Sequence, residues 1–161
     1  MRFLSFVFIS AAFIFIAPHL TSASEAEASR SSVSTTEGTA LVVSVSDLDS
    51  LPQTAFSTTT PWHAEPARFS GVLLKDYLSA KNITAKKLRF VALNDYVVES
   101  DVDIMVDGGA ILATRMNGQT LSISEKGPVF ILFNFDGESS LQHPIYYTRS
   151  VWQLDKIEIP E

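Results

Sequence analysis

The segment Ile111–Gly137 constrains the fold of this chain more than any other part of the sequence. Two apolar runs flank Asn117-Gly118, and a third begins directly after Gly127-Pro128. Asn-Gly tolerates positive φ at both central positions of a tight turn, so it joins antiparallel strands better than almost any other dipeptide. The segment therefore predicts a β-hairpin followed by a buried strand.

The first residues of the chain are typical of a secretory signal peptide. Met1-Arg2 precede a short apolar run, Phe3–Ala17, and small residues follow it. A positive start, a short apolar core and small residues at a cleavage site are the parts of such a signal. We expect residues 1–23 to be removed, with cuts after Ala26 or Ala28 as alternatives, and the mature protein to be periplasmic or secreted. The other interpretation is an uncleaved membrane anchor, but a spanning helix needs about 20 apolar residues.

The rest of the chain is acidic and has no cysteine. Without residues 1–23 it holds 11 basic and 18 acidic side chains and no basic stripe, which argues against nucleic acid or an anionic membrane surface as a partner. Residues 24–38 are rich in Ser, Thr, Ala and Glu and predict a disordered lead. Residues 39–161 suit one domain with a single core. The lack of cysteine excludes disulfides, thiolate catalysis and thiolate metal sites.

The pattern of apolar residues in this domain predicts many strands and a few short helices. Besides the hairpin, strands are expected at 40–45, 53–60, 87–93, 96–99, 129–135 and 151–159. Short helices are expected after Ser46 as cap, at 72–78 and at 100–106. Two prolines predict a loop over 61–66, and Asn94-Asp95 predicts a turn. The fold class is therefore α+β with mainly antiparallel pairing.

Four blocks of the sequence resemble the oxidoreductase molybdopterin-binding domain of the sulfite-oxidase type. They are Val45–Pro52, Phe69–Leu78, Ile111–Pro128 and Trp152–Ile159, in the family's order and at compatible spacings. Three shorter motifs are similar to a small, exported, single-domain branch of that family: Thr59–Trp62, Leu93–Tyr96 and Lys126–Pro128. The resemblance implies the sulfite-oxidase-type fold and a pocket at the family's cofactor site.

The resemblance also raises a conflict over the metal. In catalytic relatives the strand after the first block ends in a cysteine whose thiolate binds molybdenum, and that position falls near Thr59-Thr60 here. A threonine hydroxyl stays protonated and binds metals poorly. We therefore expect the fold without molybdenum redox chemistry, and molybdopterin is implied as a cofactor by the resemblance only. The alternative is an active molybdopterin-dependent oxidoreductase, or a subunit of one, whose metal lacks a protein thiolate.

Eight residues are candidates for ligand binding, some from the resembling motifs and the arginines from the fit of a guanidinium group to an anion. They are Thr59, Thr60, Trp62, Asn94, Tyr96, Arg115, Lys126 and Arg149. Trp62 is either a stacking wall for a flat ligand or an anchor that plugs the core. Asn94 and Tyr96 form either an ordinary turn or the rim of a pocket. The three basic residues either hold an anion or remain solvated surface charges.

No other motif defines an active site. His63 and His143 lack a third ligand at suitable spacing, and the acids at 101–107 lack the glycine and distal glutamate of a calcium loop, so we expect no metal. No nucleophile elbow, phosphate-cradling loop or dinucleotide fingerprint is present, and no residue is assigned as catalytic. We expect a non-catalytic domain that binds a small ligand, anionic or pterin-like, or a periplasmic protein. A sensor or interaction domain is the alternative.

Overall fold

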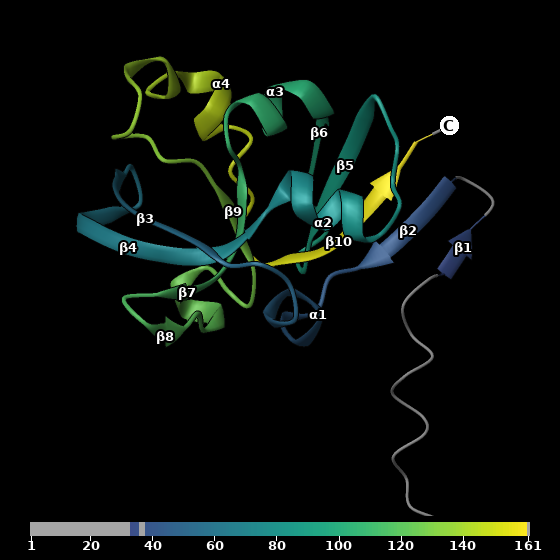
Figure 1. Ribbon diagram of the computed structural model, residues 1–161, viewed down its shortest axis with the longest axis horizontal. Helices are drawn as coiled ribbons and strands as arrows, with labels where there is room; N and C mark the ends of the chain where they lie inside the picture. The colour runs from purple at the N-terminus through teal and green to yellow at the C-terminus, as the bar shows by residue number, and fades with distance from the viewer. Residues whose placement is uncertain (1–32, 36–37, 161) are drawn as a thin grey trace, which may run out of the picture.

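Two antiparallel five-stranded sheets make up the fold (Figure 1). The computed structural model describes residues 33–35 and 38–160. The predicted signal segment 1–23 lies outside the described residues, as do residues 24–32 and 36–37 of the predicted lead. Val33–Thr35, within that lead, form strand β1 and pair with the next strand. The predicted α+β class with mainly antiparallel strands is confirmed.

The C-terminal strand lies at the centre of the first sheet, whose order is β1-β2-β10-β5-β6. Its strands are β1 (Val33–Thr35), β2 (Gly38–Val42), β10 (Leu154–Ile159), β5 (Lys87–Ala92) and β6 (Val97–Asp101). β10 pairs with β2 on one side and with β5 on the other, both antiparallel. The segment that enters β10 therefore lies beside the turn that follows β5.

The second sheet contains the hairpin predicted from Asn117-Gly118. Its strands are β3 (Thr54–Thr60), β4 (His63–Leu73), β7 (Ile111–Met116), β8 (Gln119–Thr120) and β9 (Phe130–Leu132). Asn117 and Gly118 have φ angles of +51° and +81°, as the predicted turn requires, and β7 pairs with β8 across them. β9 pairs with β7, so the predicted buried strand after Gly127-Pro128 is also confirmed.

The predicted loop over residues 61–66 is wrong, because Pro66 lies within strand β4. The pairing of β4 with β3 is irregular between Thr58 and Thr60, which leaves the proline outside a regular ladder. On its other side, β4 meets β7 only from Phe69 onward. The missing N–H of a proline removes no ladder bond at such a position.

The helices are short, as predicted, but three of their starts differ from the prediction, and the last helix was not predicted. They are α1 (Val45–Asp49), α2 (Leu74–Ala80), α3 (Val102–Asp107) and α4 (Pro144–Tyr147), with 3₁₀ turns η1 (Ile123–Glu125) and η2 (Ser139–Leu141). Ser44, not Ser46, caps α1, because Val45 is already helical and the Ser44 hydroxyl accepts the Asp47 N–H at 3.1 Å. α2 starts late because Val72 and Leu73 pair with β7, and α3 starts late because residues 100–101 pair with β5. No helix in the described ranges is long and apolar enough to cross a membrane.

Both faces of the second sheet are buried, and this places Trp62. On β7, Leu112 belongs to the larger core cluster, whereas Ile111 and Ala113 belong to a smaller one on the opposite face. The alternation follows from the two-residue period of a strand. Trp62, in the turn between β3 and β4, packs against both clusters. Its ring is therefore held where the two cores meet.

Candidate functional site: an aromatic pocket

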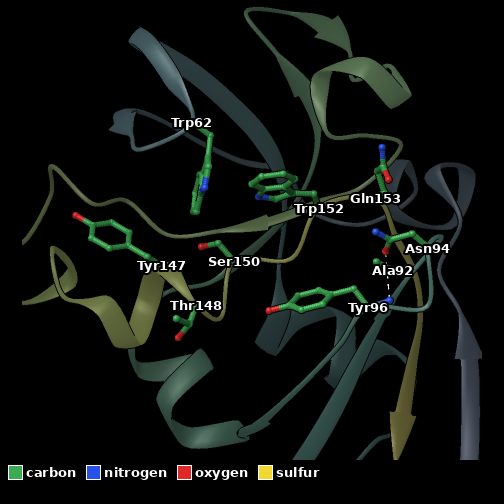
Figure 2. A pocket seen from close by; sticks show the side chains of 9 residues that line it. All are labelled: Trp62, Ala92, Asn94, Tyr96, Tyr147, Thr148, Ser150, Trp152 and Gln153. Carbon is green, nitrogen blue, oxygen red and sulfur yellow. Dashed lines mark hydrogen bonds between the residues drawn. The ribbon is translucent and has the colours of Figure 1, made fainter.

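A pocket of about 350 Å³ opens where three parts of the chain meet (Figure 2). The turn between β3 and β4, the end of β5 with its following turn, and the segment from α4 to β10 each contribute to it. The lining residues are Trp62, Ala92, Asn94, Tyr96, Tyr147, Thr148, Ser150, Trp152 and Gln153. Four of them are aromatic, and none of these described lining residues carries a charge.

Trp62 is both a pocket wall and a core anchor. Its ring centroid lies 5.6 Å from that of Trp152 and 6.4 Å from that of Tyr147, with interplanar angles of 77° and 89°. It also meets Phe130 at 5.7 Å and Phe135 at 6.3 Å, again edge to face. Aromatic pairs prefer this arrangement, which adds to the energy of burial. Trp62 therefore anchors the core and also lines the pocket, while its stacking against a ligand stays a prediction.

Two side-chain amides form a polar edge beside the aromatic rings. The Asn94 Oδ1 accepts the backbone N–H of Tyr96 at 3.2 Å, shown as the dashed line in Figure 2. The Gln153 Nε2 donates to the carbonyl oxygen of Ile123 at 2.9 Å. Gln153 has a φ of +51°, a backbone conformation that few residues adopt without a reason. The Nδ2 of Asn94 and the Oε1 of Gln153 remain free of other partners among the described residues.

Two hydroxyl groups of the pocket donate hydrogen bonds to backbone carbonyl oxygens. The Ser150 Oγ donates to the carbonyl oxygen of Tyr146 at 3.0 Å, and the Thr148 Oγ1 donates to that of Ile145 at 3.1 Å. These bonds tie the side chains to the turn at the end of α4. A hydroxyl that donates its only proton still offers lone pairs, so both oxygens act as acceptors toward the pocket.

Thr59 and Thr60 do not line the pocket, and each hydroxyl is bound to a group elsewhere in the chain. The N–H and the Oγ1 of Thr59 donate to the carboxylate of Asp136 at 2.6 and 2.7 Å. These bonds, the one from the hydroxyl first, lower the pKa of Asp136. The Thr60 Oγ1 lies 2.8 Å from the Nδ1 of His63 and accepts the Trp62 N–H at 3.2 Å. Thr60 thereby supports the pocket wall without touching the cavity.

The two arginines marked as anion ligands have partners elsewhere. The guanidinium of Arg115 donates to both carboxylate oxygens of Asp49, at 2.6 and 2.9 Å, and this bonding raises the pKa of Arg115 and lowers that of Asp49. Arg149 donates to the Ser100 hydroxyl at 2.8 Å and to the carbonyl oxygen of Ile145 at 3.1 Å. Neither arginine lines the pocket.

Lys126 is not a lining residue, but its ammonium group contacts the ring of Trp152, which is one. Its Nζ lies 4.7 Å from the centroid of the Trp152 ring, within the range of a cation–π contact. The backbone joins the same two segments, since the N–H of Gln153 donates to the carbonyl oxygen of Lys126 at 2.9 Å. Of the eight candidate residues, the structure therefore brings Trp62, Asn94 and Tyr96 together in the pocket and Lys126 next to it.

The candidate residues did not include those that the segment from the end of α4 to β10 contributes to the pocket. Tyr147, Thr148, Ser150 and Gln153 were not among the candidates, and Trp152 entered only as part of a strand block. One local signal was present: aromatic residues at 146, 147 and 152 lie close together in a short connecting segment. Aromatic side chains that are dense outside a regular strand or helix commonly mark a binding surface.

The described residues do not provide the groups that molybdopterin would need. The hydroxyls nearest to the family's cysteine position are bound to Asp136 and His63. No guanidinium or ammonium group among the described lining residues is available to hold the cofactor's phosphate. Three or more His, Asp or Glu side chains do not gather anywhere in the described ranges as a metal site would require. The cofactor of the resembled family therefore does not fit this pocket.

Comparison with known proteins adds no assignment to this geometry. No protein-family model matches the sequence, and no curated protein matches it. The function of the site is therefore inferred from its residues and their contacts.

Proposed function

We propose that this chain is an exported small-ligand-binding domain of the sulfite-oxidase-type fold that performs no molybdenum redox chemistry. The observation that carries the proposal is the pocket in which Trp62, Asn94 and Tyr96 lie together with Tyr147 and Trp152. The first three residues belong to motifs that resemble the small exported branch of that family. The antiparallel α+β architecture is compatible with this fold.

The size and lining of the pocket favour a small, flat organic ligand. A volume of about 350 Å³ lies at the lower end of the range for ligand pockets, roughly 300–1,000 Å³. Indole and phenol rings provide large rigid surfaces whose ordering costs little conformational entropy. A few polar groups among apolar walls are the usual composition of a binding site, since the walls supply affinity and the polar groups fix orientation.

The bonding of Thr59 supports the absence of molybdenum chemistry. In the resembled enzymes a thiolate at this position binds the metal, whereas here the N–H and hydroxyl of Thr59 are both bound to Asp136. Releasing the hydroxyl would cost the carboxylate of Asp136 one of its two charge-assisted hydrogen bonds, which are among the stronger hydrogen bonds in proteins.

The proposal is tested by identifying what the protein carries. The full chain is expressed in a host that makes molybdopterin, and the exported protein is analysed for metals and, by mass spectrometry, for small molecules. We expect an organic molecule that is retained by the wild type and by Arg115→Gln and is lost from Trp62→Ala. N-terminal sequencing of the same sample tests removal of residues 1–23. Near-stoichiometric molybdenum would overturn the proposal in favour of an active oxidoreductase.

A protein-interaction role is the second candidate, because several exposed large apolar side chains lie in the pocket lining and beside the turn that carries Tyr96. Leu93 and Val97, which flank the turn that carries Tyr96, are 50% and 38% exposed, and Tyr96 and Trp152 are 56% and 41% exposed. Clustered exposed apolar side chains mark interaction sites more often than isolated ones do. A Leu93→Ser/Val97→Ser variant that keeps ligand binding but loses a co-purifying protein would establish this role.

A further inference from the structure

We propose, on the basis of the ligand-binding function above, that the pocket selects an uncharged flat heterocycle with a lactam edge. Such an edge presents a carbonyl acceptor next to an N–H donor. The ligand would carry no phosphate or carboxylate group in contact with the pocket. Three independent features of the described residues lead to this class: the shape of the walls, the fixed sense of the two amides and the lack of charge.

The walls select a planar ring system. Trp62, Tyr96, Tyr147 and Trp152 come from three separate parts of the chain and surround one cavity (Figure 2). The edge-to-face contacts of Trp62 with Trp152, Phe130 and Phe135 fix its orientation. A ring that is held in place in this way loses little further freedom when it contacts a ligand, so the pocket is preorganised for a rigid flat partner.

Backbone hydrogen bonds determine which amide atom of Asn94 and which of Gln153 is left for a ligand. The N–H of Tyr96 only donates, so the atom of Asn94 that accepts it is the oxygen, and the Nδ2 remains as a donor. The carbonyl of Ile123 only accepts, so the Nε2 of Gln153 faces it and the Oε1 remains as an acceptor. The usual ambiguity of amide orientation is thus removed at both residues.

The two amides also lie on neighbouring segments. The N–H of Leu93 donates to the carbonyl oxygen of Gln153 at 2.9 Å, which joins the turn after β5 to the segment before β10. Figure 2 shows Asn94 and Gln153 on the same side of the pocket, with the oxygen of Gln153 toward Asn94 and its nitrogen away. One donor next to one acceptor is complementary to a lactam, in which a carbonyl adjoins an N–H.

The charges around the pocket argue for a neutral ligand. None of the described lining residues is ionised, and Arg115 and Arg149 are bound to Asp49 and Ser100. Lys126 has its ammonium on the Trp152 ring and is not a lining residue. An anion that is desolvated without a paired cation is costly, so a phosphate-bearing ligand would lose affinity relative to its uncharged parent.

The chain contains its own reporter for this pocket. It has two tryptophans, Trp62 and Trp152, and both line the cavity, so intrinsic tryptophan fluorescence reports on the site alone. The probes are two lactams of different size, inosine and riboflavin. Each is compared with a counterpart methylated on the lactam nitrogen, 1-methylinosine and 3-methylriboflavin, and with a phosphorylated counterpart, inosine 5′-monophosphate and flavin mononucleotide. Quenching is corrected for light absorbed by the probe.

We expect at least one lactam to bind at least about tenfold more tightly than its methylated counterpart, since one lost hydrogen bond to a desolvated partner is worth about that factor. The same lactam should bind more tightly than its phosphorylated counterpart, whose charge finds no paired cation among the described lining residues. Asn94→Asp keeps the oxygen that accepts the Tyr96 N–H and replaces the free donor by an acceptor. This variant is expected to lose about tenfold in affinity for the lactam and also for its methylated counterpart, since both keep the carbonyl that the Nδ2 of Asn94 contacts. Lys126→Gln is the matched control and is expected to keep the preference for the unphosphorylated probe.

Two results would overturn the inference. One is equal or tighter binding of the methylated or phosphorylated counterparts, with loss of all binding in Trp62→Ala; ligand binding would then stand and only the ligand class would fail. The other is no quenching by either lactam at the solubility limit, while the mass spectrometric analysis shows a different class of retained molecule. If no molecule is retained and no probe binds, the proposed function itself fails.

Discussion

The indole rings of Trp62 and Trp152 meet edge to face with their centroids 5.6 Å apart, although they adjoin strands of different sheets. Trp62 lies in the turn between β3 and β4 of the second sheet, and Trp152 precedes β10 of the first. The pocket therefore depends on how the two sheets pack against each other. Any change that shifts one sheet relative to the other is expected to alter the pocket before it unfolds the protein.

Replacing Trp62 is expected to affect stability and binding together. Trp62→Ala removes the contacts with Phe130 and Phe135. Because the lost side chain is aromatic and half-buried, the substitution should lower the free energy of unfolding by about 2–3 kcal/mol. Trp62→Phe keeps an aromatic wall and should cost about half as much. Urea unfolding measures both, and probe binding should be lost only in the alanine variant. A Trp62→Ala protein with wild-type stability and binding would refute the role of this ring.

The unfolding free energy is expected to fall in mild acid because of His63. Burial, and after it the charge of Lys126, lowers the pKa of His63 below its ordinary 6.5. The unfolded chain then binds this proton at a higher pH than the folded chain does, so stability decreases as pH falls through 6.5 toward the lower folded value. His63→Gln should flatten the stability profile between about pH 7.5 and about pH 5.5.

Lys126→Gln is the matched control for this titration. Removing the ammonium group should raise the pKa of His63 without changing its burial, so the loss of stability should become smaller in the same pH range. NMR titration of the His63 ring measures the pKa directly. A His63 that titrates at or above 6.5 in the wild type would contradict the expected direction.

Arg115→Gln is expected to leave ligand binding unchanged. Its guanidinium is bound to Asp49, outside the pocket, and surface ion pairs contribute little and depend on salt. Thermal unfolding of the variant should show a small loss of stability at low salt that disappears at high salt. Its affinity for the probes should equal that of the wild type. A large loss of affinity would mean that Arg115 leaves Asp49 to contact the ligand.

Tyr77→Phe is expected to keep or increase stability. Tyr77 is fully buried in the larger core cluster, and its hydroxyl has no hydrogen-bond partner among the described residues. Burial, and after it the charge of Asp47, raises the pKa of Tyr77 to about 12. Removing an unsatisfied buried hydroxyl should gain up to about 1 kcal/mol in the free energy of unfolding. Destabilisation by more than about 1 kcal/mol would indicate that the hydroxyl is bonded in solution.

The elements that the sequence predicted correctly are those whose cause is local. Asn117-Gly118 forms its turn because both residues adopt positive φ, and Asn94-Asp95 forms its turn because Asp95 adopts a φ of +62° and Asn94 accepts the Tyr96 N–H. Pro66 is the contrasting case. Its place inside β4 depends on where β3 and β7 pair with that strand, and sequence spacing does not encode those partners.

The predictions for the candidate site were likewise correct for some residues and not for others. Trp62, Asn94 and Tyr96 were found because they stand in motifs that resemble a family, and all three line the pocket. Arg115 and Arg149 looked equally suitable as ligands, but their actual partners, Asp49 and Ser100, lie far away in the sequence. Only the packing of the two sheets shows which polar groups are already bound and which remain free.

The most direct test of the central claim is a combined measurement of molybdenum and of organic ligand on exported wild-type protein, beside Trp62→Ala and Arg115→Gln. We predict molybdenum far below one atom per chain in all three. An organic molecule should be retained by the wild type and by Arg115→Gln but not by Trp62→Ala. Near-stoichiometric molybdenum in the wild type, or retention that does not depend on Trp62, would contradict a ligand-binding pocket without redox chemistry.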